Sequence, residues 1–168
     1  NMMPFSSVGD RVRPGGNRRS KEISLVMQNA ILPVIDLHEF PNAVVDVFIE
    51  LPQTDAGTRC AAINAASIAL ADAGIPMKDL ISSVAVGRVG DQILVDLSYD
   101  EEAYEDATVA DIPVAMVPST GEISLLQMDG DITREQLKTA LEMARKSTLK
   151  VYEAQKKALK QQYKNTGV

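Results

Sequence analysis

The chain has 168 residues, of which 45% are hydrophobic and 24% charged, a composition that excludes both a disordered and a fibrous protein. Its single cysteine excludes an internal disulfide, and the absence of any apolar run of about 18 residues excludes a membrane span, so the reducing cytoplasm is the expected compartment. The net charge of −6 argues against a nucleic-acid partner, but residues 1–25 and 134–168 are both net positive and flank an acidic middle.

The first half of the chain predicts a loop, a helix and a strand. Residues 1–19 contain glycines and prolines without a hydrophobic period, which predicts an extended segment or loop. From Ser20 to Pro33, apolar residues recur every three or four positions, which predicts a helix with Ser20 as its N-cap. Residues 43–51 alternate between apolar and polar side chains, which predicts a half-buried strand.

The second half predicts a buried helix, two hairpins and a long terminal helix. Residues 57–73 are small and mostly apolar, so we expect a helix inside the fold that ends at Gly74. Thr133 and Gln136 form a capping box that opens the last helix. This order predicts one α+β domain over residues 1–168 rather than a doubly wound sheet. The strands of the hairpins are expected at 83–88 and 92–98, then at 112–118 and 122–128.

One candidate anion site lies where the buried helix begins. The N–H groups at a helix N-terminus attract anions, and Gly57 lets an anion approach the backbone closely. Thr58 adds a hydroxyl and Arg59 adds a forked cation, so phosphate fits this position. The alternative is an ordinary helix cap in which Arg59 pairs with Asp55.

Other charged and reactive groups allow two interpretations each. Six carboxylates within residues 100–111 favour a bound cation or one raised pKa if they converge, whereas most acidic runs are solvated loops. A basic arm containing Arg18 and Arg19 can bind phosphates, whereas lysines on the terminal helix are typical of a solvated face. Cys60 lies on the buried helix and is expected in the core rather than as a reactive thiol.

Several linked stretches resemble one family in order and spacing. Residues 55–67, continued by 69–77, resemble the phosphate-binding helix of the RNase PH family, in the form found in catalytic subunits of the archaeal exosome. Residues 18–24, 46–50 and 125–130 agree with the same family, and the resemblance extends over residues 2–163. It implies an RNase PH-like (ribosomal protein S5 domain 2-like) α+β fold with mixed sheets packed against helices.

The resemblance also implies an activity. Family members degrade RNA from the 3′ end by phosphorolysis, in which inorganic phosphate attacks the terminal phosphodiester and nucleoside diphosphates leave. By position, Gly57, Thr58 and Arg59 would hold the attacking phosphate. Arg18 and Arg19 match the family's arginines that bind the RNA backbone.

The family's two catalytic aspartates match this chain less regularly. Asp111 matches the second aspartate, and the first, a general acid that also contributes to a Mg²⁺ site, lies six residues earlier in the family. The acidic loop is about three residues longer here, so this position falls on Glu105 or, with a gap of one residue, on Asp106. We expect Asp106 to be the general acid and, with Asp111, the metal ligand; Glu105 is the alternative.

The resemblance further implies a longer protein with partners. The sequence starts at Asn1 and matches the C-terminal two thirds of a family subunit. Relatives form a hexameric ring in which the active subunit alternates with an inactive RNase PH-like sister, and RNA-binding cap subunits sit on one face. The second function to consider is therefore a catalytically silent ring subunit that acts as a scaffold and RNA-binding surface.

Overall fold

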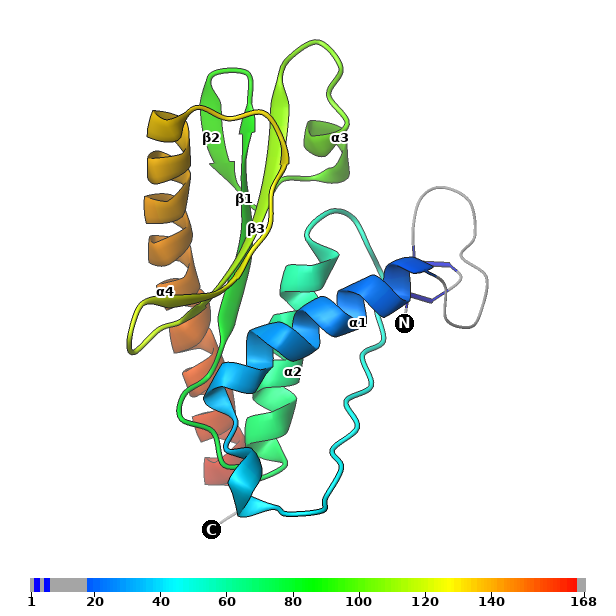
Figure 1. Ribbon diagram of the computed structural model, residues 1–168, viewed down its shortest axis with the longest axis vertical. Helices are drawn as coiled ribbons and strands as arrows, with labels where there is room; N and C mark the ends of the chain where they lie inside the picture. The colour runs from blue at the N-terminus through cyan, green and yellow to red at the C-terminus, as the bar shows by residue number, and fades with distance from the viewer. Residues whose placement is uncertain (1, 4, 7–17, 166–168) are drawn as a thin grey trace.

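The computed structural model describes residues 2, 3, 5, 6 and 18–165, which form one sheet with helices on both faces (Figure 1). Four strands lie in the order β2-β1-β3-β4, and the short β5 also pairs with β3. All pairs of named strands are antiparallel. The helices are α1 (Arg18–Ile31), α2 (Thr58–Asp72), α3 (Tyr99–Glu102) and α4 (Arg134–Asn165), and the strands are β1 (Ser82–Val89), β2 (Gln92–Val95), β3 (Val109–Val117), β4 (Glu122–Leu126) and β5 (Asp129–Gly130), with 3₁₀ turns at Leu32–Val34 and Leu37–Glu39.

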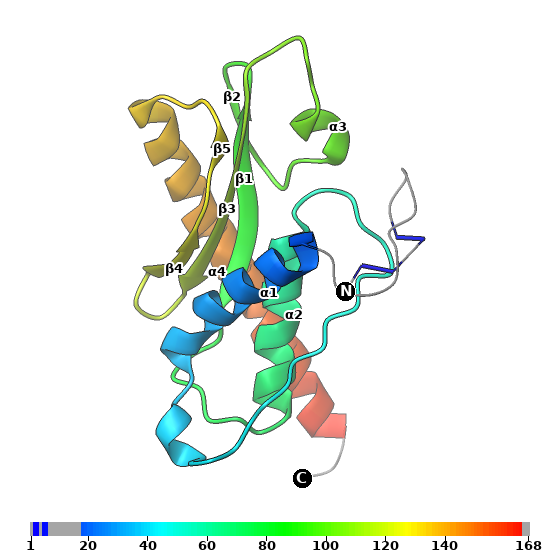
Figure 2. The ribbon, with the colours of Figure 1, turned by 45° about the vertical axis from the view of Figure 1, so that its right-hand side comes forward.

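The strand β3 separates two apolar layers of the core. Alternate residues of a strand point to opposite faces, so Ile112 and Val114 pack with Ala144 of α4 on one face. Ala115 points the other way and packs with Ile63 of α2. Figures 1 and 2 show α4 on one side of the sheet and the pair α1 and α2 on the other. The sheet therefore supports α1 and α2 on the face opposite α4.

Side chains from two helices complete the hydrogen bonding of β1 where β2 does not reach. The strand β2 pairs only with the second half of β1. The backbone N–H and carbonyl of Ser83 instead bond to the side-chain amide of Asn64, both at 2.8 Å. The N–H of Ile81 donates to Ser67, and the carbonyl of Ile81 accepts from Gln155 of α4. Because unpaired buried backbone groups are costly, these amides and hydroxyls fix α2 and α4 against the sheet.

Most predicted elements are confirmed. The structure is α+β, both predicted hairpins are present, and the buried helix spans Thr58–Asp72. The long terminal helix has the predicted capping box, in which the Thr133 N–H donates to Gln136 Oε1 at 3.1 Å and the Gln136 N–H donates to Thr133 Oγ1 at 3.3 Å. Within the described residues, no helix combines the length and apolar character needed to cross a membrane.

The predicted strand over residues 43–51 is wrong. This segment is extended, but in the described part of the chain only Leu51 forms a bridge, with Met2. Val44 and Phe48 are 84% and 87% exposed. An alternating pattern favours an extended backbone, but a strand also needs a neighbour for its N–H and carbonyl groups. Among the described residues, a β-bridge forms in this segment only at Leu51, so it is not a strand.

The first helix begins earlier than predicted. Arg18 and Arg19 form the first turn of α1 rather than the end of a loop, and the predicted N-cap, Ser20, lies within the helix. The extended segment predicted for residues 1–19 falls mostly on residues 1, 4 and 7–17, outside the described residues. Arg18 and Arg19 therefore lie on the same helix as Glu22.

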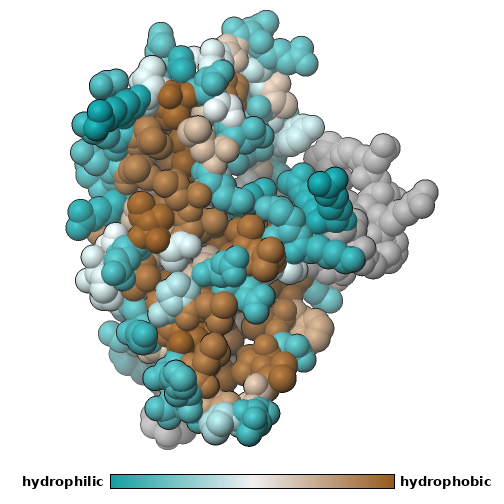
Figure 3. Space-filling model, in the orientation of Figure 1, coloured by the Kyte–Doolittle hydropathy of each residue, from teal (hydrophilic) through white to brown (hydrophobic). Residues whose placement is uncertain are grey.

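The strand β4 presents apolar side chains at one edge of the sheet. Ile123 and Leu126 are 43% and 48% exposed, and Met128, just after the strand, is 54% exposed. Apolar residues gather on the face of the molecule shown in Figure 3. Contiguous apolar surface of this kind is typical of a surface that binds another protein.

Candidate active site

An open cleft of about 850 Å³ brings together residues that are far apart in the sequence. It lies where the first turns of α1 and α2 approach α3 and β3 (Figure 2). Three arginines and four carboxylates share the cleft, so it can hold an anion beside acidic groups. The lining residues are Arg18, Arg19, Glu22, Arg59, Glu102, Val109, Asp111, Pro113, Gln127, Met128, Asp129 and Gly130.

Arg59 projects into this cleft from the start of α2. Gly57 is the N-cap and has a φ of +64°, a left-handed conformation that glycine adopts without strain. The first N–H groups of a helix have no carbonyl partner within it, so the start of α2 adds positive potential beside the guanidinium. Thr58 is buried, and neither Gly57 nor Thr58 lines the cleft itself.

The partners of Arg59 differ from the helix-cap alternative. Its Nη1 donates a hydrogen bond to Gln127 Oε1 and lies 3.5 Å from Glu22 Oε1. Asp55 does not pair with Arg59; it accepts a hydrogen bond from the Tyr99 N–H at 2.9 Å. Arg59 is therefore held by groups of the cleft.

Two carboxylates of the cleft have raised pKa values. Burial raises the pKa of Asp111, and the nearby Asp129 adds to this effect, whereas the Arg59 guanidinium opposes it. Burial and the charge of Asp111 raise the pKa of Glu102, and Arg19 and Arg59 oppose this rise. Both carboxyl groups therefore keep a proton to higher pH than exposed carboxyl groups do.

A short helix positions Glu102. The Ser98 hydroxyl caps α3 by accepting from the Glu101 N–H, and Glu101 Oε2 accepts from the Ser98 N–H at 2.8 Å. The bond from the Tyr99 N–H to Asp55 ties this helix to the loop before α2. Asp55 therefore connects the loop before α2, the helix that carries Arg59, to α3, the helix that carries Glu102.

The two residues predicted as candidates for the general acid lie outside the cleft. Glu105 and Asp106 are exposed in the turn after α3, and neither lines the cleft. Counting back from Asp111 with a gap of one residue leads to this turn. The sequence pattern does not distinguish Glu102 from the other carboxylates of the acidic run. The one local signal is the capping-box spacing of Ser98 and Glu101, which predicts the short helix that carries Glu102.

The acidic groups fit Mg²⁺ only as a site shared with substrate. Asp111 Oδ1 is buried and has no hydrogen-bond partner within the described residues, so it can accept a cation. The described residues contain no group of three or more His, Cys, Asp or Glu side chains arranged to hold a metal. Mg²⁺ commonly binds one or two carboxylates together with water and substrate phosphates, and Asp111 fits that mode. Asp106, expected as a ligand, lies in the exposed turn.

Cys60 is confirmed as a core residue. It is 4% exposed, and burial raises the pKa of its thiol to about 11. A thiol with such a pKa is protonated at neutral pH and is a poor nucleophile. Cys60 therefore supports the packing of α2 under the cleft.

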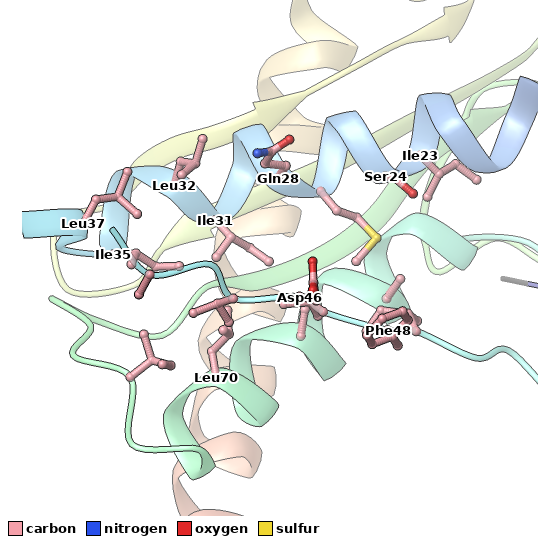
Figure 4. A pocket seen from close by; sticks show the side chains of 18 of the residues that line it. Ile23, Ser24, Gln28, Ile31, Leu32, Ile35, Leu37, Asp46, Phe48 and Leu70 are labelled. Atoms are coloured by element: carbon pink, nitrogen blue, oxygen red, sulfur yellow. The ribbon is translucent and has the colours of Figure 1, made fainter. Parts of the chain in front are cut away.

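A second cavity, of about 750 Å³, lies between α1, α2 and the extended segment 41–51. Apolar side chains dominate it, among them Ile31, Ile35 and Leu70, with Asp46 at one side (Figure 4). None of its lining residues in the described part of the chain is lysine or arginine. It lacks the positive charge that an RNA or phosphate site requires.

Comparisons with known proteins agree with this architecture. Sequence models of the 3′ exoribonuclease family match the chain with domain 1 over residues 1–76 and domain 2 over residues 79–147. The chain is 50% identical over 163 residues to "Exosome complex component Rrp41" of Thermococcus gammatolerans. The matched region covers 97% of this chain and 64% of that relative. The component of the same name from Methanopyrus kandleri is 48% identical, with 97% of this chain and 66% of the relative covered.

A solved structure shows the same fold. The rice protein Rrp46 matches with a TM-score of 0.80 over 95% of this chain and 71% of the rice chain. The two are only 18% identical, so the likeness concerns the fold alone. The present chain spans about two thirds of the length of the curated relatives it matches.

Proposed function

Since the chain belongs to the 3′ exoribonuclease (RNase PH) family, we propose that it degrades RNA from the 3′ end by phosphorolysis, as the active subunit of an exosome. The observation that carries this proposal is the cleft in which Arg59, at the start of α2, faces two carboxylates of raised pKa beside Arg18 and Arg19. Arginine forks and a helix N-terminus suit an orthophosphate, and further arginines suit the RNA backbone.

The proposed reaction is a displacement at the terminal phosphodiester. An oxygen of orthophosphate forms a bond to the phosphorus, and the bond from that phosphorus to the 3′ oxygen of the preceding nucleotide breaks. The terminal nucleotide leaves as a nucleoside diphosphate, and the 3′ oxygen takes up a proton. Arg59 holds the nucleophile, supported by the positive potential at the start of α2, while Arg18 and Arg19 hold the RNA phosphates.

Glu102 is the group that we assign to supply this proton. Its raised pKa keeps the carboxyl protonated to higher pH than that of an exposed glutamate. Asp111, which is partly buried in the same cleft, remains the acceptor for a cation through its buried Oδ1. Bound Mg²⁺ would neutralise negative charge on the reacting phosphates, and Asp111 together with substrate oxygens would hold it.

The partners we propose are RNA, an inactive sister subunit in a hexameric ring, and RNA-binding cap subunits. The exposed apolar residues at β4 support association with another protein, since such surface is costly to leave in water. A silent scaffold subunit is the second candidate, but the cleft retains arginines and paired carboxylates that a scaffold does not require.

The experiment that tests this proposal identifies the products of RNA decay. The assembled complex is incubated with RNA, with and without orthophosphate, and the released nucleotides are separated. We expect decay only with orthophosphate and nucleoside diphosphates as the product. Nucleoside monophosphates released without orthophosphate would show hydrolysis instead. If neither the assembled complex nor the sister subunit alone degrades RNA, that result would favour the scaffold.

A further inference from the structure

Gln127 holds the guanidinium of Arg59 from the side of the sheet. It lies between β4 and β5, and its backbone N–H donates to the carbonyl of Pro113 at 3.2 Å, which fixes its place beside β3. Its side-chain oxygen accepts a hydrogen bond from Arg59 Nη1. Arg59 is thereby connected to the central strand as well as to its own helix.

The contacts of Arg59 use one nitrogen and leave one edge open. Gln127 and Glu22 both face Nη1, and within the described residues the guanidinium has no other hydrogen bond or ion pair. A guanidinium carries five N–H donors, and those on Nε and Nη2 form a fork that matches two oxygens of one anion. In the described part of the chain this fork has no partner, so it is available to an anion.

The chemistry of the amide suits this task. Glu22 is 45% exposed at 3.5 Å, a distance and exposure at which an ion pair constrains a side chain only weakly. A neutral amide oxygen constrains the guanidinium without placing another negative charge next to a bound anion. A carboxylate at position 127 would hold Arg59 equally well but repel phosphate.

We propose that Gln127 is a positioning residue that orients Arg59 so that its Nε and Nη2 donors face orthophosphate. The inference rests on the proposed function, because it takes orthophosphate as the ligand of Arg59. It adds a residue that contacts no substrate and acts only through the arginine. Gln127 therefore sets the affinity for orthophosphate rather than the rate of the chemical step.

A double-mutant cycle tests this role by calorimetric titration of the assembled protein with orthophosphate. We expect Gln127→Met to weaken binding about tenfold in the native background and less than about twofold in the Arg59→Lys background, because the residue acts through the guanidinium. At saturating orthophosphate, kcat should stay within about twofold of native while the KM for orthophosphate rises. The matched control, Gln161→Met on the exposed surface of α4, should change neither quantity.

The outcomes separate this inference from the proposed function. An equal loss of affinity in both backgrounds, or a fall in kcat with an unchanged KM for orthophosphate, would overturn the positioning role of Gln127 alone. If the native protein does not bind orthophosphate at all, the proposed function fails and the inference fails with it. Thermal unfolding shows whether each variant is folded at the temperature of the titration, so that affinities are compared only between folded proteins.

Discussion

At the scale of single residues, Arg59 is where several parts of the molecule meet. It lies in the first turn of α2, forms an ion pair with Glu22 of α1 and donates a hydrogen bond to Gln127 near β3. Its charge also opposes the raised pKa values of Glu102 and Asp111. One guanidinium thus affects both the anion site and the acidic groups.

We predict that Arg59→Ala lowers the rate of RNA phosphorolysis about 100-fold or more, because a preorganised charged donor is lost where negative charge develops. The side chain is partly exposed and its ion pair is weak, so the melting temperature should change little. Single-turnover rates and thermal unfolding check the two halves of this prediction. A large loss of stability would show that Arg59 holds the fold rather than the nucleophile.

A second residue-scale prediction concerns the proton donor. Glu102→Gln should reduce the single-turnover rate about 100-fold while leaving RNA affinity unchanged, since a general acid contributes on the order of 10² to 10⁴. Asp106→Asn and Glu105→Gln are matched controls in the exposed turn and should stay within about twofold. An inactive Asp106→Asn beside an active Glu102→Gln would move the acid back to the turn.

The pH profile provides the third prediction. Glu102 must be protonated to act as an acid, and its pKa is raised, so the native rate should fall as pH rises through that pKa. The Glu102→Gln variant should lose this limb of the profile, because its amide does not titrate. A limb that persists unchanged in the variant would assign the titration to another group.

At the scale of elements, local patterns predicted much of the structure. The periodicity of α1, α2 and α4 and the turn residues of both hairpins lie within a few positions of the element that they define. The strand expected at 43–51 depended on a neighbour far away in the sequence, which a local pattern does not contain. The acidic loop has a related limit, since only the path of the chain shows that Glu102, and neither Glu105 nor Asp106, lines the cleft. No sequence pattern marks Gln127, because its proposed role depends on a hydrogen bond to Arg59, which lies 68 positions away in the sequence.

The start of α1 supports a prediction about RNA binding. Arg18 and Arg19 line the cleft from the first turn of this helix. The variant with both arginines changed to alanine should bind RNA more weakly, and the slope of log affinity against log salt should become shallower by about 1.4, because two phosphate contacts to a single strand are lost. Filter binding at several salt concentrations measures this slope. An unchanged slope would show that this turn does not contact the RNA backbone.

At the scale of the whole molecule, charge and apolar surface are unevenly distributed. The chain carries a net charge of −6, yet three arginines gather in its cleft beside four carboxylates, so RNA phosphates would find cationic partners there within a chain that is acidic as a whole. The apolar edge at β4 lies on the sheet that supports this cleft. Assembly through that edge and catalysis in the cleft would therefore depend on the same sheet.

The central claim is that orthophosphate is the nucleophile, and the fate of its phosphorus tests this most directly. The assembled protein is incubated with unlabelled RNA and radiolabelled orthophosphate, and the nucleotides are separated by chromatography. The account predicts label in the terminal phosphate of nucleoside diphosphates, with almost none formed by Arg59→Ala. Unlabelled monophosphates as the product, with no label in any nucleotide, would contradict it.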